Sequence, residues 1–176
     1  MRVRYVLRSL PVALLLLAPA RLHAQTTTVI VVRHAERADT TQQSQLSDAG
    51  RARAQSLAAA LADARIDAIY VTQYPRSLLT AEPLARRLGL TPRVVEAGGA
   101  TSAHAQAVAD RIRTEAAGRT VLVIGHSNTV PAIVAALGGG DVGVIASPEH
   151  DHVFIVLSDG SGTRVLRMGY PPRRPE

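Results

Sequence analysis

Two histidines in this chain directly follow strongly apolar runs. His34 comes after Arg33 at the end of residues 28–32, and His126 comes after Gly125 at the end of residues 121–124. Short, continuous apolar runs of this kind are typical of strands that are buried on both faces. In an open α/β sheet, ligands bind outside the carboxyl ends of the parallel strands. The sequence therefore predicts that both histidines lie at one edge of a sheet, next to a bound ligand.

Two arginines are predicted to reach the same edge. Arg33 directly precedes His34, and Arg76 follows a third apolar run at residues 68–71. A guanidinium group binds two phosphate oxygens at once and keeps its charge throughout a reaction. A neutral imidazole acts as a nucleophile when a backbone acceptor holds one ring nitrogen and the other points at phosphorus. We therefore predict that His34 takes up a phosphoryl group while Arg33 and Arg76 hold its oxygens.

Four segments carry a resemblance to a known family: Arg33-His34-Ala35-Glu36, Leu46 to Arg51, Arg76 to Ala81, and Gly125-His126-Ser127. On these segments the chain resembles the histidine phosphatase superfamily, which is also called phosphoglycerate-mutase-like. The resemblance covers nearly all of the chain after about residue 27, and residues 128–131 together with Asp151 look like a secreted bacterial subgroup. It implies a phosphohistidine intermediate on His34.

The resemblance also implies roles for other residues. His126 is expected to be a cationic partner of the phosphoryl group, with Ser127 beside it in the substrate site. Glu96 stands where longer relatives place their acidic proton donor, although residues 97–100 depart from the usual longer loop. A surface carboxylate is the alternative for Glu96. Ser127 and Asn128 are expected to begin a helix rather than to catalyse, and Glu36 is expected to shape the loop after His34.

The run Glu149-His150-Asp151-His152 has a second interpretation as a metal site. Its side chains are adjacent, and a strand that follows would send alternate side chains to opposite faces. We therefore favour a solvated loop over a metal site. The arginines and His126 already supply positive charge, so we expect no metal and no cofactor.

Strands and helices are predicted to alternate along the chain. Strands are expected at residues 28–32, 68–71, 93–95, 121–124, 153–157 and 164–168. Helices are expected at residues 47–64, from 75 onward, at 102–116 and at 128–137, with Ser47 as an N-cap and Pro83 kinking or restarting the second helix. This order predicts a single three-layer α/β domain with a mostly parallel sheet and helices on both faces. The last two strands are expected to form a hairpin that makes the last strand antiparallel.

The first 24 residues have the composition of a secretory signal peptide. Arg2, Arg4 and Arg8 precede an apolar run from Leu10 to Pro19, and small residues lead to Ala24, after which we expect cleavage. A membrane anchor is the alternative, but roughly ten apolar residues are too few to span a bilayer core that needs about 20. We therefore expect an exported protein, periplasmic or extracellular, with a domain over residues 25–170 and a disordered tail over 171–176.

The formal charge of +6 does not indicate a nucleic-acid partner. Four arginines lie in the expected signal peptide, and the remainder carries 16 arginines against 14 acidic residues, a formal charge of +2. Nucleic-acid binding would need a clustered basic face. The chain contains no cysteine. We expect a small phosphorylated substrate or a phosphohistidine protein as the partner, and neither nucleic acid nor, after cleavage, membrane.

Three functions fit these observations. We favour a metal-independent phosphatase that passes the phosphoryl group from His34 to water. A phosphoglycerate-type mutase is an alternative, but it must shield its phosphoenzyme, and only about five residues separate Glu96 from the helix near Ser102. A non-catalytic protein that binds a phosphate ligand is a second alternative. We would expect it to have lost one of Arg33, His34, Arg76 and His126, and all four are present.

Overall fold

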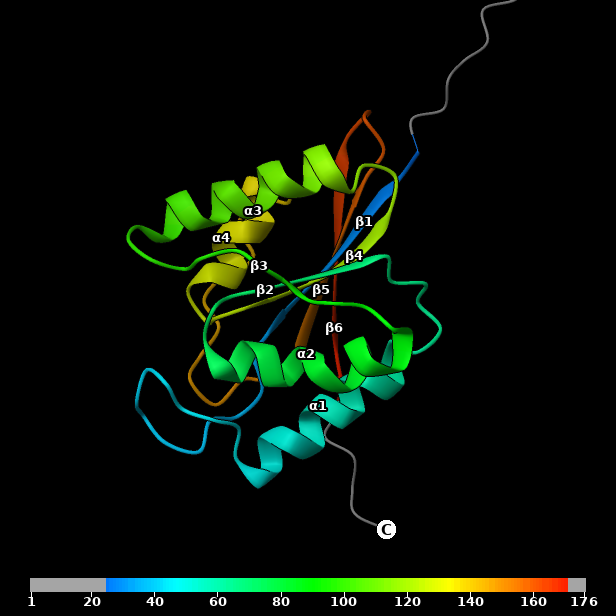
Figure 1. Cartoon of the computed structure of the whole chain (residues 1–176). Helices are drawn as coiled ribbons and strands as arrows, with labels where there is room; N and C mark the ends of the chain where they lie inside the picture. The colour runs from blue at the N-terminus through cyan, green and yellow to red at the C-terminus, as the bar shows by residue number, and fades with distance from the viewer. Residues whose placement is uncertain (1–24, 171–176) are drawn as a thin grey trace, which may run out of the picture.

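A computed structural model describes residues 25–170 of the chain (Figure 1). The expected signal peptide at 1–24 and the expected disordered tail at 171–176 lie outside the described residues. The strands of the described part are β1 (Thr27–Arg33), β2 (Ala68–Val71), β3 (Arg93–Val94), β4 (Thr120–Gly125), β5 (His152–Ser158) and β6 (Thr163–Gly169). The helices are α1 (Asp48–Ala60), α2 (Pro75–Leu88), α3 (Thr101–Glu115) and α4 (Thr129–Ala136).

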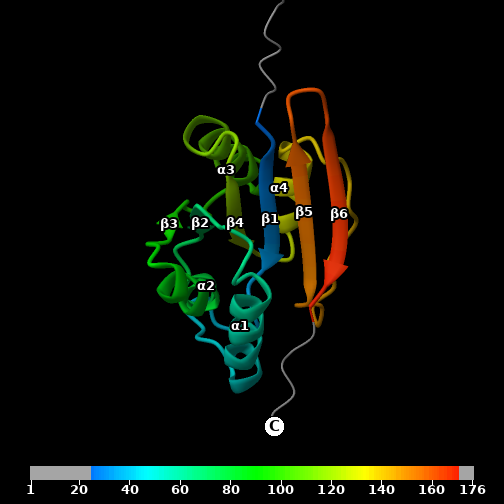
Figure 2. The same cartoon turned by 90° about the vertical axis from the view of Figure 1, so that its right-hand side faces the viewer.

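The strands form one mixed sheet in the order β3-β2-β4-β1-β5-β6. Strands β1, β2, β3 and β4 are parallel, with Val31 of β1 opposite Val123 of β4. Strand β5 runs antiparallel to β1, as the arrows in Figure 2 show. The carboxyl ends of β1, β2 and β4 therefore meet the amino end of β5 at one edge of the sheet.

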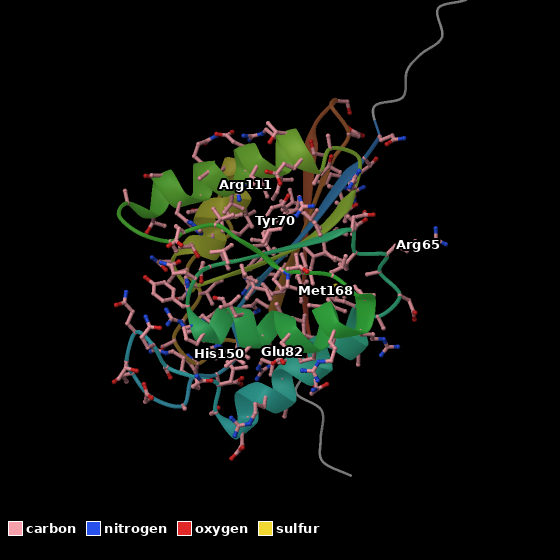
Figure 3. All side chains as sticks on the ribbon, in the orientation of Figure 1. Arg65, Tyr70, Glu82, Arg111, His150 and Met168 are labelled. Carbon is pink, nitrogen blue, oxygen red and sulfur yellow. The ribbon has the colours of Figure 1, made fainter. Side chains whose placement is uncertain are left out.

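Helices cover both faces of this sheet (Figures 1 and 2). On one face α3 and α4 pack on Val29 and Val31 of β1, and on the other α1 and α2 pack on Ile30 and Val32. Successive residues of a strand point to opposite faces, so a strand covered on both faces is apolar throughout. Tyr70 of β2 lies wholly buried in the layer toward α3 (Figure 3). The predicted α/β class, with a mostly parallel sheet between two helical layers, is confirmed.

Two local expectations differ from the structure. Pro83 does not restart a helix, because α2 is continuous from Pro75 to Leu88 and buries Ala81 and Leu84 on either side of it. The closing hairpin is present, but the strand that runs against the parallel set is β5, whereas β6 reverses again and runs with β1.

The first helix is also shorter than expected. It ends at Ala60, where the amide of Ala62 bonds to the carbonyl of Ala59 and tightens the last turn.

No helix within residues 25–170 is long and apolar enough to cross a membrane.

Candidate active site

His34 lies at the carboxyl end of β1 with a fixed ring orientation. Its amide continues the sheet by donating to the carbonyl of Gly125 at 2.9 Å, and its side chain is only 4 % exposed. Its Nδ1 lies 2.7 Å from the carbonyl oxygen of Ala35. A carbonyl can only accept, so Nδ1 carries the proton and Nε2 keeps its lone pair. The ring is therefore fixed with Nε2 free, which is the arrangement that a nucleophilic imidazole requires.

The surroundings keep this imidazole uncharged. Burial is the largest cause that lowers the pKa of His34 to about 2; His126, Arg76 and Arg33 act in the same direction, and the hydrogen bond to Ala35 acts against them. A neutral ring has its lone pair available at any ordinary pH. Nucleophilic attack by His34 therefore requires no prior loss of a proton.

His34 lines a cavity of about 300 Å³ at the edge where the parallel strands end. The cavity is lined by residues of the loops after β1, β2, β3 and β4, namely Arg33, His34, Arg37, Tyr74, Arg76, residues 97–101, His104, His126, Ser127, Asn128 and Thr129. None of these residues is acidic. A cavity with this much positive charge and no carboxylate suits an anionic ligand.

Arg33 and Arg76 reach the cavity from two different strands of the sheet. Arg33 ends β1 and Arg76 follows β2, and β4 lies between these two strands. Nη1 of Arg33 donates to the carbonyls of Ala146, Ser147 and Glu149 at 2.8, 2.8 and 3.1 Å. Nη1 of Arg76 donates to the carbonyl of Gln42 at 2.6 Å. Within the described residues neither arginine pairs with a carboxylate, and both Nε atoms are buried without a partner. Each guanidinium is thus anchored through one nitrogen and keeps others for an anion.

His126 follows β4, and its ring centroid lies 5.2 Å from that of His34. Its Nε2 is 3.1 Å from the hydroxyl of Thr72, which itself donates to Ser77 at 2.8 Å. The hydroxyl proton of Thr72 is therefore engaged, and Nε2 of His126 is the donor of the first bond. Nδ1 of His126 is buried with no partner among residues 25–170. Burial, together with Arg76, His104 and Arg33, lowers the pKa of His126 to about 3.

The sequence model of the histidine phosphatase superfamily (branch 1) matches residues 23–98, which carry Arg33, His34 and Arg76. Over these residues the chain is similar to the histidine phosphatase superfamily. No curated protein matches it significantly in sequence.

Several solved structures share the fold of this chain. YhfR of Bacillus stearothermophilus superposes with a TM-score of 0.66 at 21% identity, over 82% of this chain and 98% of YhfR. The protein histidine phosphatase SixA complexed with tungstate gives 0.62 at 23% identity, over 81% and 96%. Mycobacterial glucosyl-3-phosphoglycerate phosphatase gives 0.63 at 18% identity, over 83% and 99%. At these identities the likeness concerns the fold.

Glu96 is separated from the cavity around His34. Val95 still pairs with β2 through its amide and points into the core, so the next side chain along the strand turns outward. The Glu96 side chain is exposed and lines a separate groove with Asp110 and Arg111 on the outer side of α3. The expectation of a proton donor at this position is not supported by the structure, because Glu96 does not line the cavity, whereas residues 97–101 of the loop that follows do.

The expected substrate-site residue Ser127 lines the cavity together with Asn128. Asn128 is the N-cap residue of α4, and its side chain donates to the hydroxyl of Thr101 at 3.0 Å rather than capping the helix. This bond ties the beginnings of α3 and α4 together on one side of the cavity. Arg37, Tyr74 and His104 also line the cavity, although none of them belongs to a motif that predicts a role in the site.

His150 is the clearest departure from the predicted solvated loop. It is buried, and its Nδ1 donates to the backbone carbonyl of His34 at 2.7 Å. The two rings are 5.7 Å apart between centroids. His150 precedes β5, whose antiparallel pairing with β1 brings it to the end of β1. Among the residues described, no group of three or more histidines and acids is placed to hold a metal ion.

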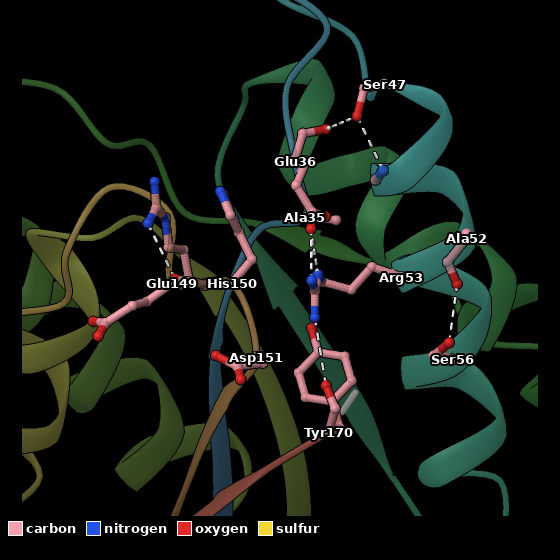
Figure 4. Close-up of polar contacts among 12 residues, drawn as sticks. Ala35, Glu36, Ser47, Ala52, Arg53, Ser56, Glu149, His150, Asp151 and Tyr170 are labelled. Carbon is pink, nitrogen blue, oxygen red and sulfur yellow. Dashed lines mark hydrogen bonds and ion pairs between the residues drawn. The ribbon is translucent and has the colours of Figure 1, made fainter. Parts of the chain in front are cut away.

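Glu36 supports the loop after His34 from behind the cavity (Figure 4). Its Oε1 accepts from Nε of Arg53 at 2.8 Å, and Arg53 also donates to the carbonyl of Tyr170 at 3.4 Å. Helix α1 packs directly on this loop, because the amide of Ser47 donates to the Glu36 carbonyl, and a Cβ at Gly50 would lie 2.2 Å from that carbonyl oxygen. Gly50 is therefore needed for the close approach that holds the loop after His34 in place.

Proposed function

We propose that this protein is a metal-independent phosphatase that transfers a phosphoryl group to His34 Nε2 and then to water. The observation that carries the proposal is the tether of His34 Nδ1 to the Ala35 carbonyl, which leaves Nε2 free beside Arg33 and Arg76. The match of residues 23–98 to the histidine phosphatase superfamily supports the same assignment.

Substrate binding supplies the negative charge that the site lacks. Arg33 and Arg76 donate to the phosphoryl oxygens through the guanidinium nitrogens that the protein leaves unpaired. Because Nε2 of His126 already donates to Thr72, Nδ1 gains a proton before it donates to a phosphoryl oxygen. A dianion next to the ring raises the pKa of His126 and so favours this protonation. Binding of a phosphate dianion is thus coupled to uptake of a proton by His126.

Attack then follows from the neutral state of His34. The lone pair of Nε2 bonds to phosphorus while the P–O bond to the leaving group breaks, and the tether to Ala35 stabilises the cationic ring that forms. Arg33, Arg76 and His126 stabilise the charge on the phosphoryl oxygens throughout the transfer. Water then displaces His34 and releases phosphate.

The cavity suits a small phosphomonoester or a phosphohistidine on a protein. Its outer side is formed by the small residues 97–101, which leave the phosphoryl site accessible. Two of the solved neighbours are by their titles a protein histidine phosphatase and a glucosyl-3-phosphoglycerate phosphatase, so both kinds of substrate occur on this fold.

Hydrolysis in ¹⁸O-labelled water with a chelator present tests the proposal. Purified protein should release phosphate from an aryl phosphate, and the phosphate should carry one oxygen from the solvent. His34→Asn keeps a donor for the Ala35 carbonyl but lacks Nε2, so it should release none. Loss of activity with the chelator, with recovery on adding a divalent ion, would contradict metal independence. Transfer to a second hydroxyl would indicate a mutase, and binding of phosphate without turnover would indicate the non-catalytic alternative.

A further inference from the structure

A phosphatase that acts on an alkyl phosphate needs a proton donor for the departing oxygen, and this cavity has no carboxylate. Its titratable side chains other than arginine are His34, Tyr74, His104 and His126. His34 is the nucleophile and His126 belongs to the phosphate clamp. The hydroxyl of Tyr74 donates to the carbonyl of Ala97 at 3.2 Å, so its proton is already engaged. His104 is the remaining candidate.

His104 lies in the first turn of α3 and forms part of a different wall from the nucleophile. Its side chain is 5 % exposed, and Nδ1 is 3.0 Å from the backbone carbonyl of Glu96. Since a carbonyl only accepts, Nδ1 carries a proton and Nε2 is the nitrogen that can gain or lose one. Nε2 has no hydrogen-bond partner within the described residues. The ring is thus oriented like that of His34, with one nitrogen on a backbone carbonyl.

Positive charge faces His104 from the other walls. The charged and titratable groups that share the cavity with it are Arg33, His34, Arg37, Tyr74, Arg76 and His126. His104 is close enough to His126 to contribute to the lowered pKa of that ring, after burial and Arg76. A phosphate dianion bound between these groups offsets their positive charge.

Resting on the function proposed above, we propose that His104 Nε2 gives a proton to the leaving group and recovers one from the attacking water. In the first step the lone pair of His34 Nε2 bonds to phosphorus, the P–O bond breaks, and its electron pair takes the proton from His104. In the second step water bonds to phosphorus, its proton passes to His104, and the P–N bond breaks with its electrons returning to His34. Ester and water become alcohol and phosphate, and both rings end as they began.

Two variants distinguish proton transfer by Nε2 of His104 from the hydrogen bond that Nδ1 makes to the Glu96 carbonyl. In His104→Asn the amide nitrogen replaces Nδ1 and keeps the bond to the Glu96 carbonyl, but Nε2 is lost. In His104→Gln the amide reaches toward the position of Nε2 and cannot transfer a proton. His152→Gln is the matched control, because His152 lies on β5, bonds to Arg167 and does not line the cavity. Thermal melting of each variant shows whether it is folded.

The measurement is kcat/KM on an alkyl phosphate and on an aryl phosphate, whose leaving group departs without a proton. Both His104 variants should lose roughly 10²-fold on the alkyl phosphate and remain within about threefold of the wild type on the aryl phosphate, as expected for general acid catalysis. They should also accumulate phosphohistidine on the aryl substrate, because water attack has lost its base. His152→Gln should behave as the wild type does.

Several results would overturn the role of His104. If His104→Asn is fully active on the alkyl phosphate, Nε2 is not the proton donor, and the only role left for His104 is its hydrogen bond to the Glu96 carbonyl. Equal losses on both substrates would indicate a role in binding or folding. If the wild type turns over and the variants match it on both substrates, the role of His104 fails while the phosphatase assignment stands. If the wild type itself releases no phosphate, the proposed function fails and the His104 role with it.

Discussion

Acid should destabilise this protein well before its carboxylates are protonated, because two histidines are buried without charge. Burial is the largest cause that lowers the pKa of His34 to about 2 and of His126 to about 3, from the ordinary value of 6.5. In the unfolded chain both rings bind a proton as the pH falls through about 6.5, whereas in the folded protein they do not. Stability is therefore present above that pH and is lost progressively between about pH 6.5 and pH 3.

The size of the loss follows from proton linkage. Consider a ring that stays neutral in the folded protein and has a pKa of 6.5 in the unfolded chain. Proton binding to the unfolded chain then lowers the free energy of unfolding by about 0.2 kcal/mol at pH 7 and by about 2 kcal/mol at pH 5. His34 and His126 together should therefore lower the free energy of unfolding by about 4 kcal/mol between these two pH values. Domains of ordinary size have about 5–15 kcal/mol in total, so the change is easily measured.

Urea unfolding at pH 7 and pH 5 measures this difference. His34→Asn and His126→Gln keep a hydrogen-bond donor toward Ala35 and Thr72, respectively, but no longer titrate. Each should show a pH-dependent loss that is smaller than that of the wild type by about 2 kcal/mol. The substitution His152→Gln, at a partly buried ring outside the cavity, is the control. An equal loss in wild type, His34→Asn and His126→Gln would refute the conclusion that these rings are neutral in the folded protein.

Three further predictions concern single positions. Arg76→Ala should lower turnover by on the order of 10³-fold, by analogy with arginine contacts in phosphoryl transfer, and near-wild-type kinetics would remove Arg76 from the phosphate clamp. Glu96→Gln should stay within about twofold on alkyl and aryl phosphates alike, since its side chain lies outside the cavity; a loss confined to the alkyl phosphate would restore it as the proton donor. Protein recovered from the periplasm or medium should begin near Gln25 by N-terminal sequencing, and material that still begins at Met1 would contradict export with cleavage.

Much of the fold could be predicted because the sheet is covered on both faces. Strands such as β1 and β4 are then continuous apolar runs, and their observed bounds exceed the predicted ones by only one or two residues. The site around His34 could be predicted for a related reason. His34 and His126 directly follow parallel strands, Arg33 ends β1, and Arg76 lies in the first turn of the helix after β2. Such positions meet at one edge whatever the details of packing.

The remaining features depend on contacts that a local pattern does not contain. Glu96 turns outward because Val95 before it is buried, which can be decided only once the length of β3 is known. His150 reaches His34 because β5 pairs with β1, a register between segments more than 100 residues apart. His104 follows a loop of small residues, and only the packing of α3 brings it to the cavity.

The most direct test of the account is to find where the phosphoryl group is attached during turnover. Wild-type protein is mixed with ³²P-labelled substrate, quenched rapidly in base, and digested for peptide mapping at alkaline pH, because phosphohistidine is stable to base and labile to acid. We expect label on the peptide that contains His34, attached to that ring, and no label in His34→Asn. Label that persists in His34→Asn, or that maps to another residue in the wild type, would contradict the central claim that His34 Nε2 is the nucleophile.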